Sequence, residues 1–207
     1  MNDRVRELAE LTGWTGRSYV NTSWGAVHAK LGFALPSDYR DLLDVFPPGT
    51  FFAPSGIANV IVWPPYRVDG VEDHLYQFET EVHEAESWRR EHPEDVPEGM
   101  VPWARSDRPG LFWVPRSPDP EVWTVAISNG GIWRYGDEPV VEEFECGAVE
   151  FLIGFVTGRL HSRVLSPRDD VRPGPMAPFR PIDEQKWLEV SDKRSPQVRR
   201  ISLRDLG

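Results

Sequence analysis

Residues 31–52 read LGFALPSDYRDLLDVFPPGTFF and contain a complete helix signal followed by the start of a strand. Pro36 suits the first turn of a helix, where a backbone N–H has no partner to lose. The apolar residues of this helix fall at i, i+3, i+4 and i+7 and form one face: Tyr39, Leu42, Leu43 and Phe46. Pro47-Pro48-Gly49 ends the helix, because proline cannot continue it. The segment is strongly specified, yet it carries no obvious catalytic group.

Four further helices are predicted from apolar residues at helical spacing. Two short ones precede the quoted stretch, at 3–11 and after the capping residue Ser23, and a glycine follows each. A long helix is expected at about 70–92, before Pro93, and a last one at about 147–158.

Strands are predicted before and after the long helix, where apolar segments alternate with turn-rich ones. Asn129-Gly130 is the strongest short hairpin signal in the chain. The expected strands cover residues 50–53, 58–63, 100–106, 111–115, 121–128, 131–135 and 140–145. Helices, then antiparallel strands, then a closing helix predict an α+β fold. We expect a single, mostly antiparallel sheet with helices packed on one side.

The chain changes character at about His161. Residues 1–161 are expected to form one α+β domain. Residues 162–207 contain six prolines, many charges and few apolar residues. This composition predicts a Pro/Arg-rich extended C-terminal tail that is partly docked or disordered.

The formal net charge of −10 is unevenly distributed. From Ser162 onward there are ten Lys and Arg against seven Asp and Glu, whereas the preceding part has 13 against 26. An acidic domain repels nucleic-acid phosphates and attracts basic proteins, so we expect a protein partner and no nucleic acid. The alternative explanation for the charge is solubility alone.

The N-terminus is charged from the start and no long apolar run follows it, which argues against an export signal or a membrane span. The single cysteine, Cys146, cannot form an internal disulfide. We therefore expect a cytoplasmic protein that does not bind membranes. Its oligomeric state is open.

The sequence contains no recognisable catalytic or metal-binding motif. The five histidines lack metal-ligand spacing, and neither a nucleophile elbow nor a phosphate loop occurs. Asp107, Asp119 and Glu121 flank the central strands and are the best candidates for acid–base chemistry, but turn and loop roles explain them more simply. We expect no metal, no cofactor and no enzymatic activity.

The long helix offers the most plausible partner-facing surface. Glu72, Glu79 and Glu86 recur every seven residues and so follow one flank of the apolar stripe. The acidity continues into the loop after the helix. The predicted partner-binding residues are Glu72, Asp73, Glu79, Glu84, Glu86, Glu91, Glu94 and Asp95. The alternative is an ordinary solvated helix face.

A set of aromatic, glycine and proline positions spans roughly Val20 to Leu160. In chain order they are Trp24, Gly32, Leu35, Pro36, Tyr39, Gly49, Trp113, Trp123, Phe151 and Leu152. Their order and spacing resemble the SUKH superfamily, which includes bacterial immunity proteins and fungal regulators of cell-wall synthesis.

The resemblance implies an α+β domain with a central antiparallel sheet and no catalytic centre. For bacterial members it implies neutralisation of a toxin, and many such toxins are nucleases, which are basic because they hold phosphate backbones. The leading hypothesis is a non-enzymatic immunity protein that occludes the active surface of a basic toxin domain. The alternative is a regulatory or scaffold protein of the same family that has no toxin partner.

Overall fold

The computed structural model describes residues 2–16, 18, 22–56, 58–63, 73–106, 109–130, 139–165 and 177–182, without the side chains of 73–77. The helices are α1 (Asp3–Thr12), α2 (Trp24–Leu31), α3 (Ser37–Val45), α4 (Asp73–Glu91) and α5 (Ala148–Val156), with a 3₁₀ turn, η1, at Pro120–Val122. The strands are β1 (Gly49–Phe52), β2 (Asn59–Val62), β3 (Val101–Arg105), β4 (Gly110–Val114), β5 (Thr124–Ser128), β6 (Val141–Phe144) and β7 (Phe179–Pro181).

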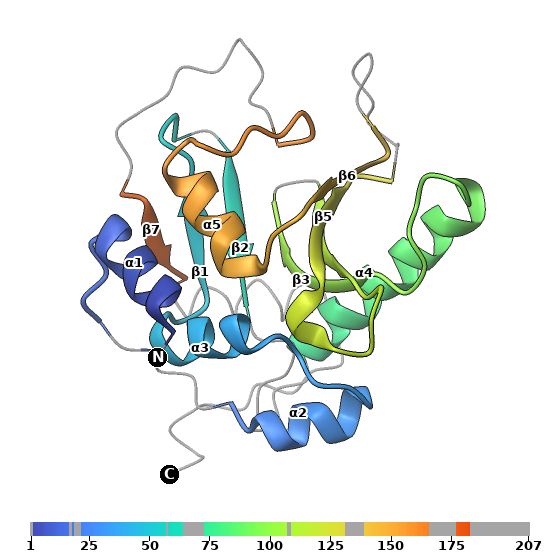
Figure 1. Cartoon of the computed structure of the whole chain (residues 1–207), viewed down its shortest axis with the longest axis horizontal. Helices are drawn as coiled ribbons and strands as arrows, with labels where there is room; N and C mark the ends of the chain where they lie inside the picture. Colours follow the sequence, from blue (N-terminus) through green and yellow to red (C-terminus); the bar gives the residue numbers. More distant parts are fainter. Residues whose placement is uncertain are drawn as a thin grey trace.

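The described strands form one antiparallel sheet in the order β6-β5-β4-β3-β2-β1-β7 (Figure 1). The α+β class and the five helices predicted from the sequence are thus confirmed. β5 pairs with β4 on one side and with β6 on the other. The predicted strand at 131–135 lies outside the described residues.

The sheet includes a strand that the sequence analysis did not predict. β7 comes from the segment after His161 and pairs with β1, with Phe179 opposite Phe51. The Phe179 ring lies 4.7 Å from the Phe51 ring and 5.0 Å from the Phe46 ring. A Cβ on Gly49 would lie 2.3 Å from the Phe179 ring, so only glycine fits there. The two residues between Pro178 and Pro181 are too few to give a strand pattern in the sequence, and the packing of the Phe179 ring identifies this strand instead.

A second part of the same segment is held by Glu142 of β6. The Ser162 hydroxyl donates to the Glu142 carboxylate at 2.6 Å, and the backbone N–H of Arg163 donates to it at 3.0 Å. Leu165, seven per cent exposed, then packs into the core. Residues 162–165 and 177–182 therefore belong to the packed body, one at each edge of the sheet.

The helices cover both faces of the sheet, not one face as expected from the sequence. The side chains of β4 and β5 alternate: Trp113 and Ile127 join the core with α1, α3 and α5, whereas Phe112 and Ala126 join a second core with α4. In Figure 1, α5 and α4 lie on opposite sides of the strands. The central strands are apolar at successive positions because both of their faces are buried.

α4 is fixed to its face by a ring contact, a close backbone approach and an ion pair. The Trp88 ring lies 5.8 Å from the Phe112 ring, edge to face. Gly130, with φ of +65°, passes so close to Trp88 that any Cβ would clash with the indole. Glu81, only five per cent exposed, lies 3.7 Å from the Arg105 guanidinium of β3.

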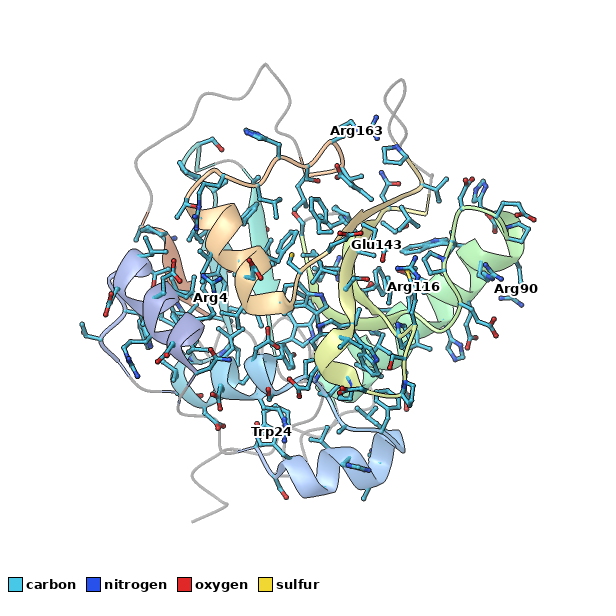
Figure 2. All side chains as sticks on the ribbon, viewed as in Figure 1. Arg4, Trp24, Arg90, Arg116, Glu143 and Arg163 are labelled. Carbon is cyan, nitrogen blue, oxygen red and sulfur yellow. The ribbon has the colours of Figure 1, made fainter. Side chains whose placement is uncertain are left out.

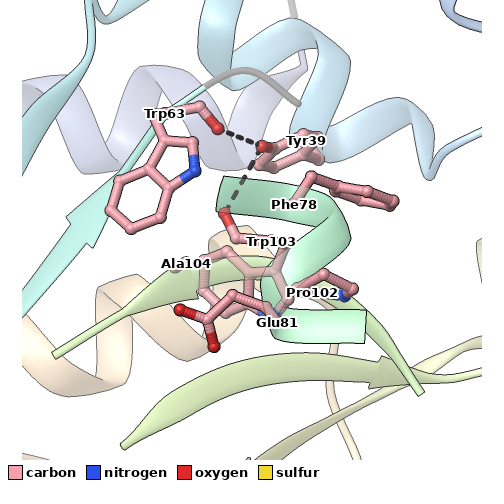
Figure 3. Close-up of a pocket in the computed structure, with 7 residues that line it drawn as sticks. All are labelled: Tyr39, Trp63, Phe78, Glu81, Pro102, Trp103 and Ala104. Atoms are coloured by element: carbon pink, nitrogen blue, oxygen red, sulfur yellow. Dashed lines mark hydrogen bonds between the residues drawn. The ribbon is translucent and has the colours of Figure 1, made fainter. Parts of the chain in front are cut away.

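Tyr39 of α3 is the centre of the larger core. Its hydroxyl donates to the carbonyl of Trp63 at 2.7 Å, and its ring meets the Trp113 ring edge to face at 4.8 Å. Figure 3 shows Tyr39 beside a cavity of about 10 Å³ that Phe78, Glu81 and other residues line. Complete burial raises the pKa of the Tyr39 phenol far above its usual value, so the hydroxyl is always a donor.

Two carboxylates cap helices that are distant in sequence. Glu121 of η1 accepts from the Ser37 backbone N–H at 2.9 Å and from its hydroxyl at 2.6 Å, at the N-terminus of α3. Asp38 accepts from the Val149 N–H at 3.1 Å in the first turn of α5. Negative charge at a helix N-terminus is favourable, so these contacts set the positions of α3 and α5.

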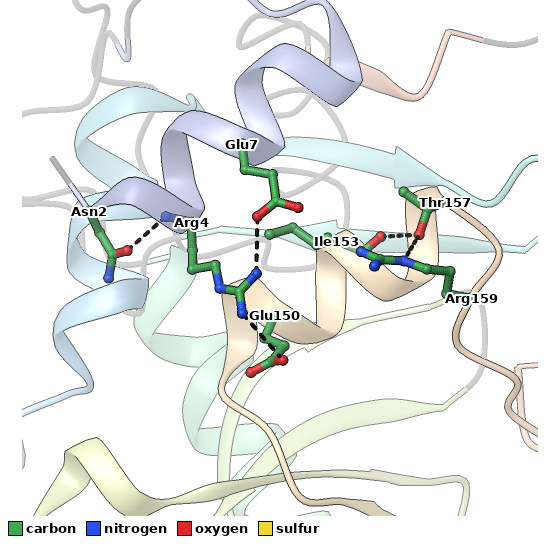
Figure 4. A network of polar contacts seen from close by, with 7 residues as sticks. All are labelled: Asn2, Arg4, Glu7, Glu150, Ile153, Thr157 and Arg159. Atoms are coloured by element: carbon green, nitrogen blue, oxygen red, sulfur yellow. Dashed lines mark hydrogen bonds and ion pairs between the residues drawn. The ribbon is translucent and has the colours of Figure 1, made fainter.

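The first and last helices of the domain are joined at the surface. Arg4 of α1 lies 3.1 Å from Glu7 and 3.8 Å from Glu150 of α5, as Figure 4 shows. These side chains are exposed, and such pairs contribute little to stability. The buried contact between α1 and α5 carries the association.

We predict that Tyr39→Phe and Tyr39→Ala separate the hydrogen bond from the ring. Tyr39→Phe should lower the free energy of unfolding by about 1 kcal/mol, because the Trp63 carbonyl loses its donor. Tyr39→Ala should lower it by about 4 kcal/mol, because a buried ring is replaced by a cavity. Urea unfolding followed by tryptophan fluorescence measures both. Equal costs for the two variants would show that the ring contributes nothing.

Candidate interaction surface

The exposed side of α4 is acidic. Glu79, Glu84, Glu86 and Glu91 all point to solvent, while Ala85 and Trp88 are buried against the sheet. Of the other predicted residues, Asp73 is described by its backbone alone and Glu72 lies outside the described residues. The four exposed glutamates are therefore available to a partner.

These glutamates do not form one continuous patch. At 100° per residue, Glu79 and Glu86 share one flank of α4, and Glu84 and Glu91 share another about 140° around the axis. Arg90, labelled in Figure 2, projects near the end of the helix about 20° from Glu79, on the flank of Glu79 and Glu86. His83 lies 3.6 Å from Glu86. Helical spacing places acidic residues on two sides of this helix, and a flat partner could contact one side at a time.

The loop after α4 presents a denser cluster of carboxylates. Arg89 donates from one nitrogen to the carbonyls of Pro93 and Val96, each at 2.6 Å. Val96, one per cent exposed, anchors the loop in the smaller core. Glu94, Asp95 and Glu98 are exposed on this fixed loop and make no ion pair with any described residue.

A second charged group lies on the neighbouring strands. Arg116, just after β4, forms a two-pronged pair with Glu143 of β6, both labelled in Figure 2. The Thr124 hydroxyl donates to the same carboxylate at 2.5 Å. The hydrogen bond from Arg116 lowers the pKa of Glu143, so this carboxylate stays ionised at neutral pH.

The loop and the strands enclose a groove of about 460 Å³, which we call the acidic groove. Its apolar lining residues include the buried Val96 and Val114 and the partly exposed Pro115 and Val141. Glu94, Asp95 and Glu98 line one margin, and the Arg116–Glu143 pair lies on the strand side. Both guanidinium groups of the groove, Arg89 and Arg116, are already hydrogen-bonded, so the carboxylates along the loop are left to attract cations.

Sequence reasoning found the loop carboxylates but missed the strand side of the groove. Glu94 and Asp95 belong to the predicted partner-binding set. Arg116 and Glu143 are 27 positions apart, and the β4-β5-β6 register brings them together. No local pattern could have identified them.

The ten aromatic, leucine, glycine and proline positions singled out in the sequence lie as follows in the described body. Leu35, Pro36, Tyr39, Trp113, Trp123, Phe151 and Leu152 are buried. Gly32 ends α2 with φ of +80°. Gly49 lies under the Phe179 ring, and the half-buried Trp24 donates to Asp44 at 3.4 Å.

The carboxylates considered for acid–base chemistry have capping roles where they are described. Asp119 accepts from the Glu121 N–H at 3.1 Å, and Glu121 caps α3. Asp107 lies outside the described residues.

Burial, with Glu150 and Asp38 nearby, raises the pKa of the Cys146 thiol to about 11. Within the described residues, no group of three or more His, Cys, Asp or Glu side chains could hold a metal ion.

None of the helices in the described part of the chain has the length and apolar character needed to cross a membrane. No family model, curated protein or solved structure matches this chain. A proposal about function therefore rests on the geometry and charge of the surface.

We predict a pH-dependent contribution from Glu143. The pKa of the Glu143 carboxyl is lower in the folded chain than its ordinary value of 4.5. The ionised carboxylate therefore stabilises the folded chain above pH 4.5, and this contribution is lost as pH falls through the pKa of the folded chain. Glu143→Gln should lower the free energy of unfolding by about 1 kcal/mol at neutral pH. Urea unfolding of both proteins at neutral pH and at strongly acidic pH measures this difference. A cost that is unchanged in acid would show that the ion pair is not its source.

Proposed function

We propose that this protein is a non-enzymatic binding module that captures a basic protein, and specifically an immunity protein that covers the active surface of a toxin domain. The SUKH-like pattern of the sequence motivates the specific form of the proposal. The contact surface is the loop 94–98 together with the adjoining flank of α4. The compartment in which this takes place is proposed to be the cytoplasm.

One observation carries the proposal: carboxylates stand exposed and unpaired on a segment that is rigidly held. A flexible acidic loop would lose side-chain and backbone freedom on binding, which weakens an interface. Here Arg89 and Val96 hold the loop in place before any partner arrives. The −10 net charge adds long-range attraction for a basic partner and increases its association rate.

The mode of action follows from this geometry. A basic nuclease domain presents cations where it holds a phosphate backbone, and a rigid row of carboxylates offers them similar charge. Binding there occludes the active surface without any bond being made or broken. The affinity should fall with added salt, because the contacting groups are exposed.

We predict that reversing two groove charges weakens toxin capture. Glu94→Lys/Glu98→Lys should reduce affinity for the cognate toxin by about 100-fold, since each change removes an attraction and adds a repulsion. Survival of cells that co-express the toxin, and titration calorimetry with an inactive toxin variant, measure the effect.

Glu10→Lys/Glu150→Lys is the matched control, because it makes the same charge change at exposed positions of α1 and α5, which pack on the face of the sheet opposite α4. It should protect nearly as well as the natural chain. If both pairs of substitutions weaken capture equally, net charge and not this surface is responsible. If no basic toxin is captured by the natural chain, the immunity function is wrong.

The scaffold alternative is tested by removing the end of the chain. Because β7 and residues 162–165 are packed in the body, the truncation must begin after Ile182 and not at Ser162. We predict that a chain ending at Ile182 still protects against the toxin. A scaffold that recruits partners through its C-terminal segment should instead lose them in pull-down experiments with this truncated chain.

A further inference from the structure

The sequence beyond the last described residue contains a strongly basic segment. Residues 193–204 read KRSPQVRRISLR, with five basic residues and no acidic one. The same chain therefore carries a cationic segment and a groove edged with unpaired carboxylates. Opposite charges in one chain interact at a high effective concentration, because the covalent link keeps them together.

We propose that the acidic groove is a docking site for residues 193–204 of the same chain. The groove would then hold an internal ligand that competes with external basic partners. The docking itself is independent of any toxin, and its regulatory consequence rests on the proposed function.

Charge complementarity is the first argument. The groove contributes four carboxylates and two guanidinium groups, and both guanidinium groups have partners within the body. Glu94, Asp95 and Glu98 remain to accept cations along one margin. Arg199, Arg200 and the other basic residues of the segment match this row.

Apolar complementarity is the second argument. Among the apolar residues that line the groove, Pro97, Pro115 and Val141 are partly exposed and can contact a ligand, whereas Val96 and Val114 are buried. The segment places Val198, Ile201 and Leu203 among its arginines. An extended chain directs successive side chains to opposite sides, so Ile201 and Leu203 share one side while Arg200 and Arg204 share the other.

The segment can reach the groove. The described chain ends where the Ile182 N–H donates to the Pro48 carbonyl at 2.9 Å, beside the start of β1. β1 and β4 are three strands apart in the sheet, which corresponds to about 15 Å. Eleven residues from Ile182 to Lys193 span up to about 36 Å, enough for a path around the end of the sheet.

Zero-length carbodiimide cross-linking of the full chain tests the docking. The chain contains three lysines, Lys30, Lys186 and Lys193, so products are simple to assign by mass spectrometry. We expect Lys193 to be joined mainly to Glu94, Asp95 or Glu98 in the monomer. A mixture of ¹⁵N-labelled and unlabelled protein distinguishes links within one chain from links between two copies.

A matched pair of variants tests the role of the arginines. Arg199→Glu/Arg200→Glu leaves Lys193 and all groove carboxylates intact but reverses two charges, and the cross-link yield should fall about tenfold. Arg168→Glu/Arg172→Glu makes the same charge change outside the segment and should leave the yield unchanged. Links to Glu79 or Glu84 at equal frequency, links only between copies, or equal yields in both variants would each overturn the docking.

Competition provides an independent measurement. A synthetic peptide of residues 193–204 should bind the full chain about tenfold more weakly than a chain ending at Asp192, because the tethered segment occupies the groove. The shorter chain retains every described residue. Equal affinities would contradict the inference, whereas failure to find a toxin would contradict only the proposed function.

Discussion

The packing of α3 against the indole rings of β3 and β4 organises the larger core. Tyr39 contacts Trp113, and Trp113 stacks on Trp103 at 5.9 Å, which in turn meets Phe151 of α5. Each such aromatic pair adds about 1 kcal/mol to the burial of its rings. Neither buried indole N–H finds an acceptor among the described residues, a cost of about 1–3 kcal/mol each that the ring packing must offset. This cluster joins α3, β3, β4 and α5 through ring contacts.

The other face depends on α4 and has a different character. Its core is smaller, and a buried carboxylate of the same helix, Glu81, pairs with Arg105 of β3. Removing one partner of a buried ion pair is expensive, so this contact constrains how α4 lies on the sheet. The loop after α4 inherits that constraint through Arg89 and Val96. A rigid acidic margin is thus a consequence of how the second face is packed.

In the docking that we propose, the groove links the two charge-separated parts of the chain. Acting alone, the acidic body would attract a basic partner, and the basic end of the chain would repel it. Every partner would have to compete with the tethered segment for the groove. If the segment binds with modest affinity, a strongly basic surface displaces it and a weakly basic surface does not. In this way, specificity arises without any further contact residue.

The sequence by itself determined the five helices, the α+β class and the acidic character of the loop after α4. Those features depend on spacing, caps and composition within a few residues, as the LPSDYRDLLDVFPPG segment illustrates. Only the tertiary structure decided that helices cover both faces, that Phe179 lies on β1, and that Arg116 meets Glu143. These depend on contacts between residues distant in sequence, whose partners are selected by shape and register and leave no local pattern. The described glutamates of the predicted set on α4 show the same limit. Glu79, Glu84, Glu86 and Glu91 are exposed, but the distribution of charge around the surface depends on how the helix packs.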